Sequence, residues 1–314
     1  MIRSMGMAFV LVGILFGPSQ AGGQTRSEVY AAACRQAIGD IPSFSCGNGV
    51  IVPITVDGSP APATKGMNCD RPALLSNGPD SDGQCVPHSR ILSLSTPYMQ
   101  VAVMCRQKKI RPAAILVFDE IDVVAHNPTS GATCWFQATG QNGKPVDGAA
   151  VPSPTAAPTS GYWTDPATTV KEGCGNCHDS GPFVYSPFVG QVWSKMPADP
   201  FGPYFHVDPA GLGFDKWPTA AFFPRDNTCL ACHRIGTQAS CGNLTRWMTG
   251  RAVPEGANEW ARRYPGSHGM PPLADLSRQS WNEIYAASVD QILSCCEKPE
   301  QPACRRTDIW KMPK

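Results

Sequence analysis

Apolar residues cluster between residues 113 and 138, and their β-branched and aromatic character predicts strands. Residues 113–124 read AAILVFDEIDVV and form the best strand candidate, with Phe118, Ile121 and Val123 in one run. A turn sequence follows at residues 126–131, and residues 132–138 (ATCWFQA) predict the second strand of a hairpin. Residues 50–56 (VIVPITV) are also β-rich, but their internal proline predicts an edge strand or an irregular one.

Helical spacing is clearest near the C-terminus. Four large side chains share one face of a predicted helix over residues 281–293: Trp281, Ile284, Tyr285 and Ile292. Residues 280–283 read Ser-Trp-Asn-Glu and predict a capping box at its start. A shorter helix is predicted over residues 27–38, with Ser27 as the N-cap. Residues 57–99 are rich in Gly, Pro, Asn, Asp and Ser, which predicts loops.

The length and composition suggest two domains of an α+β protein. The chain has 314 residues, and domains average ~150. Residues 145–166 hold five prolines among small residues and predict an extended linker. The expected organisation is a disulfide-stapled, β-rich domain at 22–144 and a mainly helical, loop-rich domain at 167–314. The net charge of +1 argues against a nucleic-acid partner, which would require a basic excess.

Residues 1–21 predict a signal peptide. Arg3 supplies the positive start, residues 7–16 are uncharged and apolar, and residues 19–21 place small residues before the expected cleavage site. The apolar run is shorter than the ~20 residues that span a bilayer. No later stretch is long and apolar enough to cross a membrane. The sequence therefore predicts a periplasmic or secreted protein that begins at Gly22 and has no transmembrane segment after cleavage.

The second half carries the same short motif twice. Residues 174–178 read Cys-Gly-Asn-Cys-His, and residues 229–233 read Cys-Leu-Ala-Cys-His. Each is a complete C-x-x-C-H, the attachment sequence of a c-type haem. Two thiols three positions apart can add to the two vinyl groups of one haem, and the adjacent imidazole can bind its iron. The pattern predicts two covalent haems c, held by Cys174, Cys177, Cys229 and Cys232, with His178 and His233 as proximal ligands.

Other uses of paired cysteines explain the motifs less well. A zinc ribbon usually separates its pairs by ~15–20 residues, fewer than lie between Cys177 and Cys229, and gives no reason for the histidines. A thioredoxin-like site needs only one pair, in a βαβ setting. Ordinary disulfides also leave the histidines unexplained.

On these two motifs, residues 174–270 resemble the haem-binding part of a dihaem cytochrome c. The resemblance covers at most the C-terminal half. It implies the cofactor and export more firmly than a fold, because attachment motifs of this kind occur on unrelated folds. Residues before about 165 match no cytochrome pattern.

The remaining ten of the fourteen cysteines divide evenly between the halves. Six lie before residue 165 and four after residue 233, so each half is expected to close its own disulfides. In the first half, pairing of sequence neighbours gives Cys34–Cys46, Cys69–Cys85 and Cys105–Cys134. In the second half, Cys295 and Cys296 are expected to reach Cys241 and Cys304, because adjacent cysteines form a strained pair.

The sequence offers two candidates for the second axial ligand of each haem iron. His206 lies 28 residues after His178 and follows two aromatic residues, with Met196 as its rival. Met270 lies 37 residues after His233, and the prolines after it resemble the distal loop of class I cytochromes; His268 competes with it. Of the other histidines, His88 and His126 are expected to be ordinary surface or turn residues.

These observations favour an exported electron-transfer protein that exchanges electrons with unidentified redox proteins. No catalytic residue stands out. The alternative is an enzyme resembling dihaem peroxidases or oxidases, in which one iron stays open for substrate. A third hypothesis makes the first half a docking module for an attached electron carrier.

Overall fold

The computed structural model describes residues 24–75, 77–140, 144–156, 161–197, 201–209, 211–262, 270 and 276–309. The predicted signal peptide at 1–21 lies outside them. Within this part of the chain, the largest sheet has six strands in the order β1-β4-β5-β7-β8-β10. Their bounds are β1 Val50–Ile51, β4 Arg90–Ser93, β5 Gln100–Arg106, β7 Glu120–His126, β8 Ala132–Thr139 and β10 Phe205–His206.

The predicted hairpin is confirmed at the centre of this sheet. β7 and β8 pair antiparallel, with Glu120 opposite Thr139 and His126 opposite Thr133. The first strand starts later than the sequence predicts, because residues 117–118 form a separate short strand, β6 (Val117–Phe118). In the turn, the Asn127 side chain accepts hydrogen bonds from the amides of residues 129 and 130.

Strand β10 brings the second half of the chain into the sheet. It pairs parallel with β8, next to the hairpin turn, and the amide of Phe205 donates to the carbonyl of Gly131. Gly131 has a φ of 87°, and a Cβ there would lie 2.6 Å from the carbonyl carbon of Pro203. A glycine at this position therefore permits both the turn and the close approach of β10.

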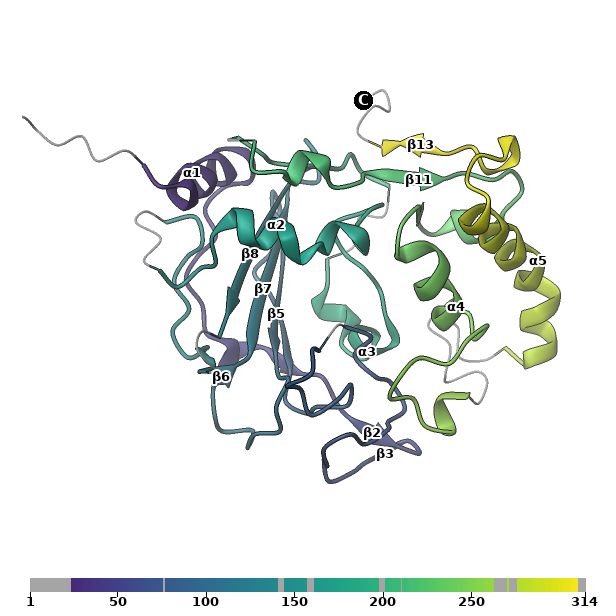
Figure 1. Cartoon of the computed structure of the whole chain (residues 1–314), viewed down its shortest axis with the longest axis horizontal. Coiled ribbons are helices and arrows are strands. Elements are labelled where there is room, and N and C mark those ends of the chain that lie inside the picture. The colour runs from purple at the N-terminus through teal and green to yellow at the C-terminus, as the bar shows by residue number, and fades with distance from the viewer. Residues whose placement is uncertain are drawn as a thin grey trace, which may run out of the picture.

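Two helices cover one face of the sheet near β8 (Figure 1). They are α1 (Arg26–Ile38) and α2 (Pro166–Glu172). The predicted N-cap Ser27 is wrong, because Thr25 caps α1 and forms a capping box with Glu28. Tyr30 of α1 is buried, and its hydroxyl accepts a hydrogen bond from the amide of Trp135 on β8.

The structure describes all fourteen cysteines, and ten of them form disulfides: Cys34–Cys134, Cys46–Cys105, Cys69–Cys85, Cys241–Cys296 and Cys295–Cys304. Each half closes its own bridges, as predicted, and the second-half pairing is confirmed. In the first half only Cys69–Cys85 is right. Pairing of sequence neighbours fails elsewhere because α1 packs across β8, and because β4, the neighbour of β5, contacts the turn that begins at Cys46.

The segment predicted as a linker is instead part of the packing. β9 (Val146–Asp147) pairs with β6, and Val151 forms a bridge with Phe44. The largest apolar core combines residues of both halves, including Val103 and Ile121 with Tyr204 and Phe214. The predicted linker 145–166 is therefore corrected over residues 146–151, where the segment pairs with β6 and with Phe44. The proposed boundary between 22–144 and 167–314 does not separate two cores.

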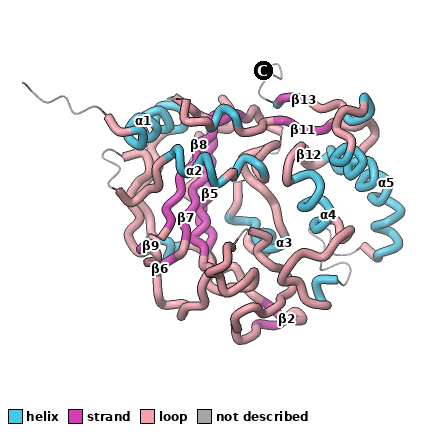
Figure 2. The backbone as a smooth tube through the Cα atoms, in the orientation of Figure 1, coloured by secondary structure: helices cyan, strands magenta, loops and turns pink. Residues whose placement is uncertain are grey.

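Apart from one long helix near the C-terminus, the second half has short elements joined by turns and loops (Figure 2). The remaining elements are β2 Thr55–Val56, β3 Ser59–Pro60, α3 Pro187–Gly190, β11 Ala220–Phe222, β12 Ile235–Gly236, α4 Thr245–Met248, α5 Arg278–Glu297 and β13 Thr307–Asp308. β11 lies between β12 and β13. The interruption of residues 50–56 into β1 and β2 agrees with the irregular strand that the sequence predicts.

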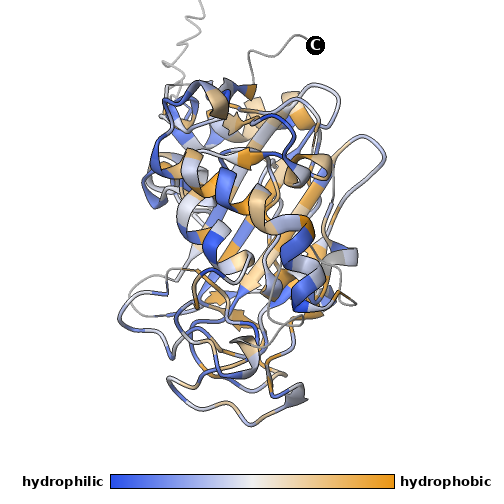
Figure 3. Ribbon diagram, turned by 90° about the vertical axis from the view of Figure 1, so that its right-hand side faces the viewer, coloured by the Kyte–Doolittle hydropathy of each residue, from blue (hydrophilic) through white to orange (hydrophobic). Residues whose placement is uncertain are grey.

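Helix α5 confirms the predicted C-terminal helix but extends it at both ends. Its N-cap is Ser277, whose side chain accepts from the amide of Ser280, so the capping box predicted at 280–283 is wrong. Trp281 and Ile292 are buried, whereas Ile284 is 47% exposed and lies off the packed face. Figure 3, which views the α4–α5 side, shows apolar and polar positions mixed along the long helix in front. Among the described residues, no helix combines the length and apolar composition required to cross a membrane.

Candidate functional site

The first motif occupies a tight turn directly after α2. Gly173 ends that helix with a φ of 71°, and the turn Cys174–Asn176 follows. The amides of Cys177 and His178 both donate to the carbonyl of Cys174, at 3.1 and 3.0 Å. One turn of backbone therefore carries both thiols and the imidazole, as the spacing predicts.

His178 is oriented by a backbone carbonyl. Its Nδ1 lies 2.8 Å from the carbonyl oxygen of Pro182. A carbonyl only accepts, so Nδ1 carries the ring proton and Nε2 keeps its lone pair. Burial lowers the pKa of His178 to about 4, and the bond to Pro182 opposes this effect. The imidazole is therefore neutral at pH 7 and suited to bind a metal through Nε2.

Aromatic residues from both halves surround His178. We call Trp135, Tyr204, His206 and Trp217 the aromatic cluster. The Trp135 ring lies 4.9 Å from the His178 ring, and Trp217 lies 5.4 Å from Trp135. The Tyr204 hydroxyl donates to the carbonyl of His178. Because Trp135 lies on β8, the first half of the chain forms part of the surroundings of the first motif.

Gly175, between the two cysteines of the first motif, lies against the aromatic cluster. A Cβ at this position would lie 2.6 Å from the Trp217 ring. The motif tolerates any residue at this position, so the sequence did not single out Gly175. Here the fold requires glycine.

His206 lies beside the first motif, as the sequence alternative requires. It is 7% exposed, and its Nδ1 accepts a hydrogen bond of 3.0 Å from the Trp135 indole. That bond places the ring proton on Nε2. Burial lowers the pKa of His206 to about 3, although the nearby Pro218 carbonyl raises it. For Nε2 to bind iron, the proton would have to leave it and the indole bond would have to break.

Met196, the rival of His206, lies in a different apolar group. It packs with Val52, Phe188 and Val192 beside the Cys69–Cys85 disulfide. Trp135, Tyr204 and Trp217 of the aromatic cluster belong to the main core, which is separate from the group that holds Met196. The structure therefore brings His206, and not Met196, next to His178.

The second motif is held by α5. Asn227 caps the turn Thr228–Ala231, and its side chain accepts from the amide of Cys229. The same side chain donates to the carbonyl of Ser288 on α5, and the Ser288 hydroxyl accepts from the amide of Thr228. The Nδ1 of His233 lies 2.7 Å from the carbonyl oxygen of Arg234. Both motif histidines thus place Nδ1 against a carbonyl.

The alternatives for the second motif are only partly described. His268 lies outside the described residues. The amide of Met270 donates to the carbonyl of Met248, the last residue of α4, at 2.9 Å.

The four motif cysteines differ from the other ten cysteines of the chain, which are all in disulfides. After the five disulfides are counted, the unpaired cysteines are Cys174, Cys177, Cys229 and Cys232. Burial raises the pKa of Cys174 to about 12, and the carboxylates of Asp122 and Glu120 add to this effect. Burial also raises the pKa values of Cys177 and Cys229. Cys232 is exposed.

Asp179 follows the first motif directly and is fully buried, with its carboxylate bonded to the segment after the second motif. Burial raises its pKa to about 6, although the hydrogen bonds from Ser240, Gln238 and Thr237 oppose this shift. Sequence reasoning missed Asp179, since nothing in the local pattern identifies its distant partners.

The two remaining histidines have structural contacts. His126 was expected at the surface or in a turn, but it is 1% exposed at the end of β7 and bonds Thr133 through Nδ1. That prediction is wrong because the hairpin turn begins only after His126. His88 is half-buried, and its Nδ1 bonds the carbonyl of Arg111.

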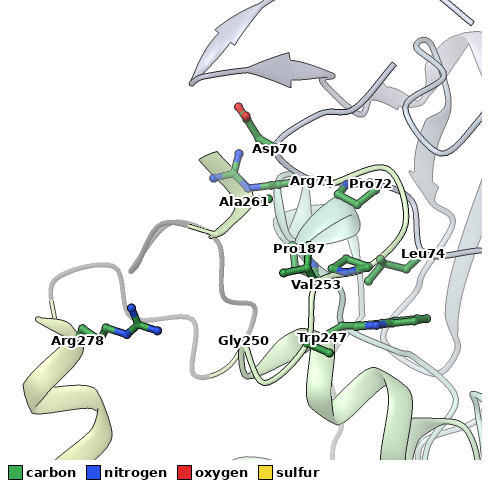
Figure 4. A pocket seen from close by; sticks show the side chains of 12 residues that line it. Asp70, Arg71, Pro72, Leu74, Pro187, Trp247, Gly250, Val253, Ala261 and Arg278 are labelled. Carbon is green, nitrogen blue, oxygen red and sulfur yellow. The ribbon is translucent and has the colours of Figure 1, made fainter. Parts of the chain in front are cut away.

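A cavity of about 190 Å³ lies away from both motifs (Figure 4). Its lining includes Arg71, Leu74, Pro187, Trp247, Val253 and Arg278, and none of the predicted site residues that the structure describes. Among the described residues, no three or more His, Cys, Asp or Glu side chains are grouped to hold a metal ion.

Searches with family models, curated proteins and solved structures returned no match to this chain.

Proposed function

We propose that this chain is an exported dihaem c-type cytochrome that transfers electrons between redox partner proteins. One observation carries the proposal. Ten of the fourteen cysteines are paired, and the four that remain form two Cys-x-x-Cys-His motifs. Thiols in an oxidising compartment usually pair, so four thiols left in this pattern favour covalent attachment of two groups.

The chemistry of the donor set fits two haems. Cys174 and Cys177 would hold one haem and Cys229 and Cys232 the other, through thioether bonds. His178 and His233 would each offer Nε2, since Nδ1 contacts a carbonyl in both. A carbonyl at Nδ1 is the usual partner of a metal-bound histidine, because it fixes the ring and its tautomer. When bound, haem supplies a one-electron redox centre.

The residues around each motif determine how accessible its haem would be to partner proteins. The aromatic cluster and the main core pack against the first motif, whose two cysteines are half-buried, whereas Cys232 of the second is exposed. A redox centre near the surface is accessible to partner proteins, so we assign electron entry and exit to the second motif. The predicted signal peptide supports maturation and function outside the cytoplasm.

One observation favours the alternative function, a dihaem oxidoreductase with an open iron. The Trp135 indole donates to His206 Nδ1, which keeps the proton on Nε2. In that arrangement His206 would not be a ligand, and a haem held by the first motif would lack this second protein donor. Met270 and His268 remain the proposed alternatives at the second iron.

Spectroscopy of the exported protein tests both functions. The electron carrier predicts two haems per chain, low-spin spectra and slow carbon monoxide binding after reduction. Rapid carbon monoxide binding at one haem, lost in a variant of the first motif (C174A/C177A) and kept in the matching variant of the second (C229A/C232A), would favour the enzyme. Absence of haem from the purified exported protein would contradict both.

A further inference from the structure

Asp179 links the first attachment motif to the segment that follows the second. One carboxylate oxygen accepts from the amides of Thr237 and Gln238, at 2.5 and 2.6 Å. The other accepts from the hydroxyl of Ser240 at 2.5 Å. The carboxylate is fully buried, and an ionised group in such a place is costly unless donors surround it. Three donors from one segment satisfy that requirement.

A second contact runs in parallel. The amide of Ala239 donates to the carbonyl of Asn176, inside the first motif, at 2.9 Å. The carbonyl of Asp179 also accepts from the amide of Ala220 on β11, the strand that pairs with β12. Residues 176–179 and 237–240 are therefore joined side by side, although about sixty positions separate them in the sequence.

Gly236 allows this close approach. A Cβ at Gly236 would lie 1.9 Å from Asp179 Oδ1 and 2.0 Å from Ser240 Oγ. Real Cβ atoms do not approach other atoms so closely, so any side chain here would displace the carboxylate or the loop. Gly236 lies on β12, three residues after His233, so the displacement would reach the second motif.

We propose that Asp179 is a positioning residue that sets the second attachment motif relative to the first, and thereby the geometry of electron exchange between the two haems. The inference rests on the proposed dihaem function. In that exchange one haem iron loses one electron and the other gains it, and no bond or proton moves. The role of Asp179 is geometric and does not require its negative charge.

The test compares three variants of the full exported protein with the parent. Asp179→Ala removes the acceptor, and Gly236→Ala disrupts the same contact from the other side. Asp179→Asn keeps an oxygen for the two amides and offers its NH₂ group to the Ser240 hydroxyl oxygen. Ser180→Ala, a change at the next residue, serves as the matched control.

Two measurements follow, after mass spectrometry has established two haems in each variant. The first is the rate of electron exchange between the haems after flash reduction. Electron exchange slows steeply as the separation of two redox centres grows, so we expect the rate to fall at least several-fold in D179A and G236A. The second is hydrogen exchange of the Thr237 and Gln238 amides, which should lose protection in D179A. D179N and S180A should resemble the parent in both.

Some results would overturn the proposal. One is a D179A protein with two haems, parental exchange rate and parental amide protection. Another is a D179N protein as slow as D179A, which would make the charge, and not the geometry, decisive. Should D179A fail to fold, a parental rate in G236A would overturn it equally. A parent without two haems refutes the proposed function separately, and the amide protection still tests the contact.

Discussion

Replacement of Trp135 by phenylalanine tests whether the first half of the chain organises the first motif. Trp135 is 3% exposed, touches the His178 ring and donates to His206 Nδ1 at 3.0 Å. W135F keeps an aromatic ring and removes that donor. The smaller ring loses apolar burial worth about 1–2 kcal/mol. The His206 nitrogen left without its donor adds about 1–3 kcal/mol. We expect the free energy of unfolding to fall by about 2–5 kcal/mol in total.

Trp163 offers a matched control. It is 7% exposed in the same core, and its indole nitrogen has no hydrogen-bond partner among the described residues. W163F therefore loses similar apolar burial without a hydrogen bond. Urea unfolding followed by circular dichroism, with disulfides intact, gives both losses by linear extrapolation. W135F should be the less stable by about 1–3 kcal/mol. Equal losses in the two variants would refute the role of the indole bond.

Three further predictions concern packing, charge and cross-links. Gly175→Ala should destabilise the protein by about 1–3 kcal/mol in urea unfolding and reduce haem incorporation at the first motif, because its Cβ would meet the Trp217 ring at 2.6 Å; parental stability and haem content would contradict this. The pKa of Asp122 is raised by burial and by Glu120, so the folded state holds its proton above the ordinary pKa of 3.8. Asp122→Asn should therefore stabilise the protein at pH 7, and its advantage should shrink as the pH falls toward 3.8; an advantage that grows in acid would reverse the sign. Removing Cys34–Cys134, with a sequence separation of 100, should lower the free energy of unfolding by about 4.7 kcal/mol. Removing Cys295–Cys304, with a separation of 9, should lower it by about 2.6 kcal/mol. Thermal unfolding of the two double serine variants should show that order, and the reverse order would exclude loop length as the main cause.

Local patterns predicted what depends on local contacts. The β7–β8 hairpin follows from two strand-like runs around one turn, and α5 follows from its spacing of apolar side chains. The division of the cysteines into two motifs and two closed sets also came from spacing and counting. Strain between adjacent cysteines predicted that Cys295 and Cys296 reach Cys241 and Cys304, without saying which cysteine takes which partner.

Contacts between distant segments could not be predicted in this way. The sequence gives no sign that Trp135 reaches His178, or that β10 joins β8, because each contact depends on how two elements pack. The first-half disulfides failed for the same reason. A proline-rich composition indicated a linker at 145–166, yet β9 pairs there with β6. The amino-acid composition of a segment indicates how much entropy the segment loses when it becomes ordered. It does not indicate which strand the segment will pair with.

Peptide mass mapping of the exported protein after denaturation, without reduction, tests the proposed haem attachment most directly. We expect a mature chain beginning at Gly22 and the mass of one haem on the peptide with Cys174 and Cys177. A second haem should lie on the peptide with Cys229 and Cys232, and the other ten cysteines should appear only in disulfide-linked peptides. Unmodified motif cysteines, or a disulfide within either motif, would contradict it.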